Sequence, residues 1–253
     1  MKIGLLMAGE NSGEIANKYG EYEQQFIDLF EPLHSKNNTP IEWKVYYVMR
    51  DEFPISIDDC DAYIITGSRF GVYDELPWMI DLAAYIRLIV SAKKRLTGVC
   101  FGHQIIAHAL GGKVIKVEQG FGVGMHEYKM VIPSAIAHLA QDNDFALKTT
   151  FTVNVMHGDQ VVERPPTAEI IATSDFCEFA GLYYPEGVLT YQGHPEFDNQ
   201  FIRDLIDYKW NNGQNWVDTQ VKNQAINSAP NGKPSNRLPI AKFLLNFMTE
   251  KTV

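Results

Sequence analysis

The sequence predicts an α/β fold: an open, mostly parallel central sheet flanked by helices. Short apolar runs alternate with segments that repeat apolar residues at helical spacing, which is the rhythm of βαβ units. The chain has 253 residues, of which 45% are hydrophobic, and this is enough for one large buried core. Near the middle, an apolar strand turns sharply at Cys100 into a helix. We therefore expect a single domain over residues 1–253, in which 211–253 is a polar arm followed by a C-terminal helix.

The first part of the chain alternates strands and helices. The expected elements are a strand at 3–7, a helix at 14–33, a polar loop at 35–40, strands at 43–48 and 62–66, and a helix at 78–93. In open parallel sheets, sites form outside the carboxyl ends of the strands. The loop after Thr66 and the turn after Val99 should therefore lie side by side.

The second part of the chain is more extended. The expected elements are a glycine-interrupted extended region at 114–131, strands at 151–155, 169–172 and 188–191, helical periodicity at 201–208, and a last helix at 240–248. Residues 211–237 are rich in Asn, Gln and Ser. This stretch could be a short helix with a loop, a lid or a mobile arm, and the sequence leaves these alternatives open.

The turn at Cys100 has the pattern of a nucleophile elbow. A sharp strand-to-helix turn strains the central residue and leaves no room for neighbouring side chains, which is the role we expect for Gly98 and Gly102. The turn also puts the sulfur at the positive end of the next helix, where the thiolate is favoured over the thiol. A lone cysteine is more often a buried structural residue, but the two glycines favour a reactive one.

A second pair of residues can complete such a site. A thiolate nucleophile needs a base, and the base needs a group that orients its other ring nitrogen. His194 and Glu196 lie two residues apart at the end of a predicted strand and project to the same side. Taken alone, this pair is equally compatible with an exposed loop histidine beside an incidental carboxylate.

Charge and cysteine content narrow the class of protein. A net charge of -9 without any run of Lys or Arg argues against nucleic acid and membrane surfaces as partners. Three cysteines without disulfide-type spacing indicate a reducing compartment. The apolar start of the chain is too short for a signal peptide, so we expect a cytoplasmic protein. No zinc-type spacing and no phosphate-binding glycine motif occurs, so we expect neither a metal nor a nucleotide cofactor.

Three motifs together resemble one family. Residues 98–104, Gly-Val-Cys-Phe-Gly-His-Gln, resemble the Gly-x-Cys-x-Gly-x-Gln nucleophile motif of class I glutamine amidotransferases. Residues 193–196 resemble the closing His-Pro-Glu of that family, and residues 156–161 resemble the His-Gly-Asp segment of its GMP synthetase branch. The resemblance runs from about residue 62 to 197 in the family's order. It implies a flavodoxin-like sheet.

The resemblance also implies a Cys100, His194 and Glu196 triad. Cys100 would attack the side-chain amide of glutamine, His194 would protonate the departing ammonia and then activate water, and Glu196 would orient His194. The tetrahedral oxyanion needs two N–H donors. Elbow geometry makes the Phe101 N–H one of them.

The remaining roles are carried over from the family. The resemblance places the second oxyanion donor at Gly67 and Ser68, and it assigns Gln104 and His157 to substrate binding. One departure concerns the oxyanion loop, because many relatives have Gly-Gly-Pro or Gly-Ser-Pro where this chain has Gly67-Ser68-Arg69. Arg69 could meet a substrate carboxylate or lie solvated on the loop, and we favour the solvated position.

The other histidines and cysteines are expected to be structural. His103 and His108 should be packing or surface groups, and Cys60 and Cys177 small core residues. No partner pattern is visible for His34, His126 and His138.

These residues support two enzymatic functions and one alternative. An amidotransferase would release ammonia from glutamine for a separate synthetase subunit, since no part of this sequence is patterned as a synthetase. A stand-alone γ-glutamyl peptidase would use the same triad on γ-glutamyl peptides or conjugates. A non-catalytic binding or regulatory protein of the same fold is the third possibility, and the intact triad argues against it.

Overall fold

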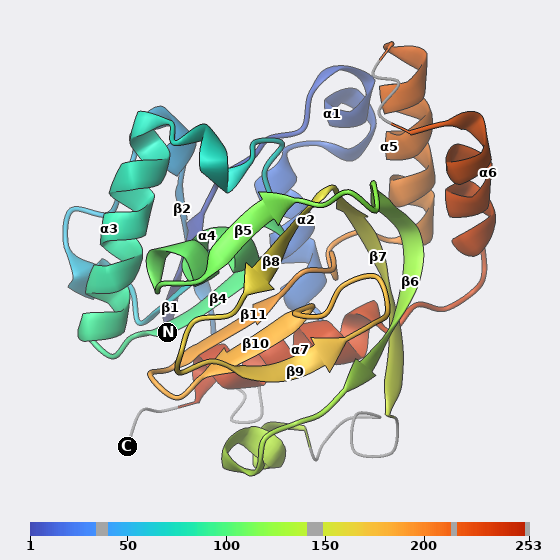
Figure 1. Cartoon of the computed structure of the whole chain (residues 1–253). Helices are drawn as coiled ribbons and strands as arrows, with labels where there is room; N and C mark the ends of the chain where they lie inside the picture. Colours follow the sequence, from blue (N-terminus) through green and yellow to red (C-terminus); the bar gives the residue numbers. More distant parts are fainter. Residues whose placement is uncertain (34–39, 141–148, 214–216, 251–253) are drawn as a thin grey trace.

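The structure is a computed structural model that describes residues 1–33, 40–140, 149–213 and 217–250. Nine strands form one sheet in the order β2-β1-β3-β4-β11-β10-β9-β6-β7, and β5 pairs with β8 in a separate small sheet. Helices cover both faces of the large sheet (Figure 1). The predicted open sheet flanked by helices is therefore confirmed.

Five strands form the parallel part of the sheet. They are β2 (Glu42–Tyr46), β1 (Lys2–Leu6), β3 (Ala62–Ile65), β4 (Arg95–Val99) and β11 (Val188–Tyr191). The inner four are almost continuously apolar because helices bury both of their faces. Their carboxyl ends point to the edge where the loops that build the candidate site are gathered.

The sheet continues as an antiparallel extension that the sequence did not reveal as such. It consists of β10 (Gly181–Tyr184), β9 (Glu169–Thr173), β6 (Gly122–Met130) and β7 (Thr150–His157). The strands β5 (Lys113–Lys116) and β8 (Asp159–Glu163) lie beside the extension. The predicted extended region at 114–131 is thus two strands that belong to different sheets.

The large sheet separates the hydrophobic core into two layers, each covered by helices. One face of the sheet is covered by α3 (Pro77–Ser91) and α4 (Phe101–Ala109), and the other by α2 (Tyr22–Phe30) and α7 (Arg237–Thr249). The helices α1 (Gly13–Tyr19), α5 (Asn199–Asn211) and α6 (Thr219–Ser228) lie at the end of the molecule near the candidate site (Figure 1). Among the described residues, no helix is both long and apolar enough to cross a lipid bilayer.

The predicted helix at 14–33 is wrong as a single element. The chain breaks at Gly20, which has a φ of 72°, and its N–H closes α1 on the carbonyl oxygen of Ala16. Positive φ is accessible to glycine without steric cost, so the break needs no other cause. As a result, Tyr22 begins a new helix and turns into the core, where it is 6% exposed.

Other boundaries shift by a few residues, and two strands were missed. The strand expected at 43–48 ends at Tyr46 and is followed by a short 3-10 turn, Val48–Arg50. The strands β8 and β10 have only five and four residues, which is too short for a clear periodic signal. His34 and most of the loop expected at 35–40 lie outside the described residues.

The polar stretch at 211–237 contains a helix in its described part. The Asp218 carboxylate caps α6 by accepting from the Val221 N–H, and Ser228 Oγ accepts from the Met125 N–H at 2.8 Å. Of the three alternatives for this stretch, a short helix with flanking loops is the one found. It packs against β6.

Candidate active site

Cys100 occupies a strained turn between β4 and α4. Its φ of 53° and ψ of -106° are unusual for a residue with a side chain, and its N–H is anchored on the Tyr191 carbonyl oxygen at 2.9 Å. A Cβ on Gly98 would come within 2.5 Å of the Gly102 carbonyl carbon, and a Cβ on Gly102 would overlap the Ile65 carbonyl oxygen. The glycines on both sides of the nucleophile are therefore required by close packing, as the sequence predicts.

Cys100 lies directly before the N-terminal end of α4. Phe101 is the first residue of α4, and the first N–H groups of a helix have no partner within it. The Phe101 N–H is thus available to a negatively charged oxygen that forms next to the sulfur. Cys100 itself is 5% exposed.

His194 and Glu196 form a buried hydrogen-bonded pair. The distance between His194 Nδ1 and Glu196 Oε1 is 2.6 Å, and each residue is 4% exposed. The imidazole stacks on the Phe197 ring with centroids 4.0 Å apart. The backbone N–H of His194 donates to the Asn154 carbonyl oxygen at 2.8 Å. The exposed-loop alternative for this pair is therefore wrong, because both side chains are inside the protein.

His194 also interacts with Cys100, so the three predicted catalytic side chains lie together. Burial alone would lower the pKa of His194, but the charges of Glu196 and of the Cys100 thiolate, and hydrogen bonds to both side chains, outweigh burial and raise it. The arrangement puts the imidazole next to Cys100, with the Glu196 carboxylate behind the ring. It can perform nucleophilic chemistry followed by proton transfer.

Tyr22 is a member of this network that the sequence did not reveal. Its hydroxyl donates to Glu196 Oε1 at 2.7 Å, and its oxygen lies next to Gly67. Burial and the Glu196 charge raise the pKa of Tyr22 well above its ordinary value, so the hydroxyl remains a donor. No local motif marks Tyr22, because it reaches the site from α2, far along the chain.

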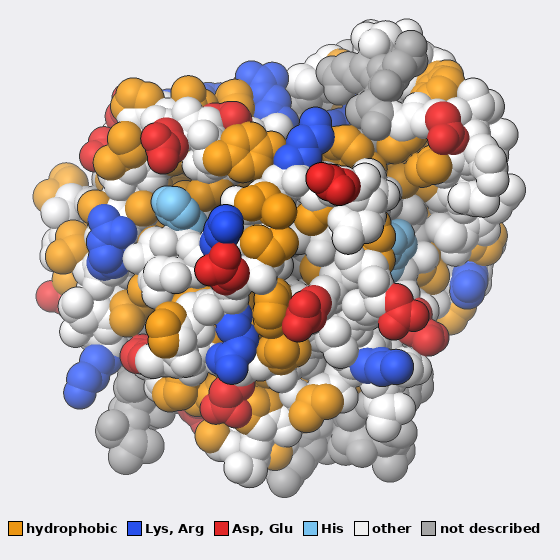
Figure 2. All heavy atoms as spheres, in the orientation of Figure 1, with side chains coloured by type: hydrophobic (Ala, Val, Ile, Leu, Met, Phe, Trp, Pro, Cys, Tyr) orange, Lys and Arg blue, Asp and Glu red, His pale blue; other side chains and the backbone are white. Residues whose placement is uncertain are grey.

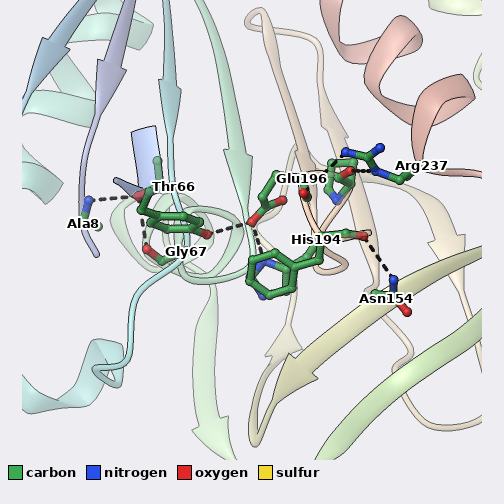
Figure 3. Close-up of polar contacts among 10 residues, drawn as sticks. Ala8, Thr66, Gly67, Asn154, His194, Glu196 and Arg237 are labelled. Carbon is green, nitrogen blue, oxygen red and sulfur yellow. Dashed lines mark hydrogen bonds and ion pairs between the residues drawn. The ribbon is translucent and has the colours of Figure 1, made fainter. Parts of the chain in front are cut away.

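Arg237, at the start of α7, holds the His-Pro-Glu segment from the other side. Its Nε donates to the Pro195 carbonyl oxygen at 2.9 Å, and its Nη2 approaches the Glu196 carbonyl oxygen at 3.5 Å (Figure 3). These bonds fix the backbone on which the carboxylate is mounted. The sequence carries no signal for this role either.

The loop after β3 packs directly against the three side chains. A Cβ on Gly67 would lie 2.9 Å from His194 Cε1 and 3.7 Å from Cys100 Cβ. Thr66 fixes the loop, because its hydroxyl accepts from the Ala8 N–H at 3.0 Å and donates to the Gly67 carbonyl oxygen at 3.1 Å (Figure 3). The N–H groups of Gly67 and Ser68 remain the candidates for the second oxyanion donor.

The two residues predicted to bind substrate are buried and engaged with the protein. Gln104 is 3% exposed, and its Nε2 donates to the Asp159 carbonyl oxygen at 2.8 Å and to Gln192 Oε1 at 3.1 Å. His157 is 4% exposed, and burial lowers its pKa to about 3. His157 Nδ1 lies 3.0 Å from the Asp159 carbonyl oxygen, whereas Nε2 has no partner among the described residues. Both side chains are thus held by the Asp159 carbonyl oxygen, and their role in substrate binding stays a prediction.

A pocket of about 200 Å³ opens beside His194. Its walls are the loop after β1 (residues 8–12), the loop at 67–70 and the inner side of α5, and neither Gln104 nor His157 lines it. Arg69 and Lys209 are on its wall. Figure 2 shows Lys and Arg side chains near the upper edge of the molecule. Arg69, for which we favoured a solvated position, is exposed but also borders this pocket.

Among the described residues, the other histidines and cysteines that we examined for a role lie away from the three side chains of the candidate triad or are held by the fold. His103 is buried with Nδ1 at 2.8 Å from Thr190 Oγ1, and burial lowers its pKa to about 3. His108 is exposed, and His138 interacts with Glu250. Cys60 and Cys177 are buried free thiols. Within the described ranges, no group of three or more His, Cys, Asp or Glu residues could hold a metal ion.

Comparison with known families shows to which family this chain belongs. The sequence model of the family described as "Glutamine amidotransferase class-I" matches residues 36–202, about two thirds of the chain. The chain belongs to the class I glutamine amidotransferases. Among curated proteins, this amidotransferase-family chain is 28% identical to a glutamine amidotransferase-like protein of Schizosaccharomyces pombe, over 96% of this chain and 98% of that protein. It is 27% identical to Gamma-glutamyl peptidase 2 of Arabidopsis thaliana, over 81% of this chain and 80% of that protein.

Solved structures of the family share the fold. A glutamine amidotransferase from Thermotoga maritima superposes with a TM-score of 0.72 at 16% identity, over 99% of both chains. One from Methylobacillus flagellatus gives a TM-score of 0.67 at 18% identity, over 98% of this chain and 91% of the other. These similarities confirm the class I amidotransferase fold that the three motifs imply.

Proposed function

We propose that this chain cleaves γ-glutamyl amide bonds through a thioester on Cys100. The observation that carries the proposal is the buried pair of His194 and Glu196, with Nδ1 and Oε1 2.6 Å apart, in interaction with a cysteine held on a strained elbow. Membership of the amidotransferase family supports the same chemistry.

In the first half-reaction, the Cys100 sulfur attacks the γ-carbonyl carbon of the substrate. Negative charge develops on the carbonyl oxygen, and the N–H groups of Phe101 and Ser68 would stabilise it. Removing one such donor typically raises the barrier by ~3 kcal/mol. The imidazolium of His194 then gives its proton to the departing nitrogen as the C–N bond breaks, which leaves the γ-glutamyl group on sulfur.

In the second half-reaction, water replaces the leaving group. Neutral His194 takes a proton from the water, whose oxygen attacks the thioester carbonyl carbon. The C–S bond breaks, and glutamate and the Cys100 thiolate are released. Glu196 keeps the imidazole oriented and stabilises its charged form, as the carboxylate does in other triads.

Two substrates fit this chemistry. Glutamine would yield ammonia for a separate synthetase subunit, a function that the name of the Schizosaccharomyces pombe relative supports. A γ-glutamyl peptide or conjugate would be hydrolysed without any partner, and the name of the Arabidopsis relative supports this second function. Both reactions pass through the same thioester.

The test is a side-by-side assay of glutamine, γ-glutamyl dipeptides and glutathione conjugates. We expect release of ammonia, or of a free amine or peptide, and complete loss of activity in Cys100→Ala. Cys177→Ala is the matched control, because it removes another buried thiol and should remain active. A glutamine-like electrophile should label wild type at Cys100. Unchanged turnover in Cys100→Ala would remove the mechanism, and absence of both labelling and turnover would favour a non-catalytic protein.

A further inference from the structure

The turn that carries His194 and Glu196 lies against the outer edge of β7. This strand is the last in the order of the large sheet, so one of its edges has no neighbouring strand among the described residues. Instead, Asn154 of β7 and His194 form an isolated antiparallel bridge. A Cβ on Gly193 would come within 2.5 Å of Val153 Cγ1, so the two segments approach closely. The candidate base is therefore mounted on the edge of β7.

The side chain of Asn154 holds the far end of the same turn. Asn154 is completely buried. Its Nδ2 donates to the Phe197 carbonyl oxygen at 3.1 Å (Figure 3), and it also donates to Asn199 Oδ1 at 3.1 Å. The turn closes on itself where the Phe197 N–H donates to the His194 carbonyl oxygen at 3.2 Å. Asn154 thus binds both ends of the turn, His194 through its backbone and Phe197 through its side chain.

Neighbouring carbonyl groups fix the orientation of both amides. A backbone carbonyl oxygen only accepts, so the atom of Asn154 that faces Phe197 is Nδ2. Asn199 Nδ2 donates to the carbonyl oxygens of Pro230 and Lys233 at 3.0 and 2.8 Å, which leaves its Oδ1 to accept from Asn154. Asn154 Oδ1 has no hydrogen-bond partner among the described residues. Because a buried acceptor without a partner costs stability, packing alone does not account for an asparagine at this position.

Phe197 connects this restraint to the imidazole. Its ring is stacked on the ring of His194 with an angle of 4° between the two planes, and it packs on Phe201 with centroids 4.5 Å apart. The hydrogen bond from Nδ1 to Glu196 holds one atom of the imidazole, but the ring could still turn about that bond. The stacked Phe197 ring fixes the plane, and with it the direction of Nε2 relative to Cys100.

We propose that Asn154 is a positioning residue for the candidate base His194. The Asn154 amide holds the Phe197 carbonyl, Phe197 holds the plane of the imidazole, and the imidazole thereby stays directed toward Cys100. The inference rests on the function proposed above. Asn154 does not line the pocket beside His194, so it acts through the turn and not through contact with a substrate.

The test compares two substitutions that remove the donor in different ways. Asn154→Leu keeps most of the side-chain volume, whereas Asn154→Ala leaves a cavity. Both should lower kcat for a γ-glutamyl substrate by about 10- to 100-fold, as expected when a catalytic group is misplaced by about 1 Å, and both should leave KM unchanged. Labelling of Cys100 with a glutamine-like electrophile, carried to completion, counts the intact sites, so kcat is expressed per site.

The pH profile separates positioning from a loss of folded protein. Burial lowers the pKa of His194, but the charges of Glu196 and Cys100 outweigh burial and raise it, and Tyr22 reaches Glu196 from α2. In the proposed mechanism His194 must carry a proton to release the leaving group, so activity falls at alkaline pH. An imidazole turned away from Cys100 loses part of the effect that raises its pKa. The alkaline limb should therefore move to lower pH in both variants, whereas unfolded protein would scale the profile without moving it.

Asn246→Leu is the matched control. Asn246 of α7 is buried, and its Nδ2 donates to the Leu139 carbonyl oxygen at 3.0 Å, so the variant loses the same kind of buried amide outside the turn. It should leave kcat and the pH profile unchanged. Asn199→Ala is a second comparison, because it cuts the bonds to residues 230 and 233 but keeps the bond from Asn154 to Phe197. Its kcat should fall by less than about threefold.

Several outcomes would contradict the role of Asn154. Wild-type kcat in Asn154→Leu would overturn the inference, and a loss in Asn154→Ala alone would assign the effect to packing. An unmoved pH profile, or an equal loss in Asn199→Ala, would also overturn it while the proposed function stands. If wild type cleaves no γ-glutamyl compound, the proposed function is rejected and the inference falls with it.

Discussion

Tyr22→Phe tests whether the triad depends on a fourth residue. The change removes one hydroxyl and keeps a ring that packs against Phe26 and Phe197. Glu196 Oε2 has no hydrogen-bond partner among the described residues, so Oε1 carries both bonds of this buried carboxylate, one to Tyr22 at 2.7 Å and one to His194 at 2.6 Å. The variant would leave the carboxylate with a single side-chain partner, the imidazole of His194.

The magnitude follows from the bond that is lost. A hydrogen bond to a charged group contributes about 1.5–3 kcal/mol, and a factor of ten in rate corresponds to ~1.4 kcal/mol. We expect kcat/KM for a γ-glutamyl substrate to fall about 10- to 100-fold, and the free energy of unfolding to fall by up to about 3 kcal/mol. Steady-state kinetics and urea denaturation measure the two effects.

Tyr47→Phe provides a closely matched control. The Tyr47 hydroxyl donates to Glu23 Oε1 at 2.6 Å, so the same atom is removed from the same type of bond, but outside the pocket. It should leave kcat/KM unchanged. If Tyr22→Phe retained the kcat/KM of wild type, or if Tyr47→Phe reduced it equally, the support that we assign to Tyr22 would not exist.

Three further predictions concern the glycines and the imidazole. Gly67→Ala should lower kcat/KM by roughly 100-fold, because the new Cβ would come within 2.9 Å of His194 Cε1; activity close to wild type would show that the loop can move aside. Gly20→Ala should lower the free energy of unfolding by about 1–3 kcal/mol with unchanged kinetics, because its φ of 72° and ψ of -160° are open almost only to glycine but no atom lies within 4 Å of its Cβ position. The raised pKa of His194 stabilises the fold below the pKa of an unfolded histidine, about 6.5, and this stabilisation is lost as the pH rises through the folded-state pKa. The stability difference between wild type and His194→Ala should therefore decrease toward alkaline pH in denaturation experiments, and alkylation of Cys100 at neutral pH should be slower in the variant.

The parts of the site that could be predicted are those that depend on local sterics. Gly98 is required because a Cβ there would meet Gly102 in the same turn, although the atoms that exclude a Cβ at Gly102 belong to Ile65 on β3. His194 and Glu196 meet because they are two residues apart at one strand end. The break at Gly20 was missed because the apolar pattern of 14–33 continues across it. Periodicity reports which face is apolar and not whether the helix axis is continuous.

The unpredicted parts depend on contacts between distant segments. Tyr22 meets Glu196 across 174 positions of sequence, and Arg237 meets Pro195 from the last described helix. Gln104 belongs to the recognised motif, yet its amide is engaged by Asp159 and Gln192. A motif thus identifies which residues share the site but not which of them face the substrate.

The residues of the proposed triad and the residues that line the pocket also come from different parts of the chain. The three residues of the proposed triad, Cys100, His194 and Glu196, lie within the segment that matches the family, between residues 36 and 202. The pocket in front of them is completed by residues 8–12, before that segment, and by α5, which continues beyond it to Lys209. Tyr22 and Arg237, which hold the carboxylate from opposite sides, also lie outside the matched segment. We therefore expect substitutions within α5 or the loop after β1 to change which γ-glutamyl compounds are accepted without disturbing the proposed triad, and a comparison of glutamine with γ-glutamyl dipeptides as substrates is the measurement in which such a change would appear first.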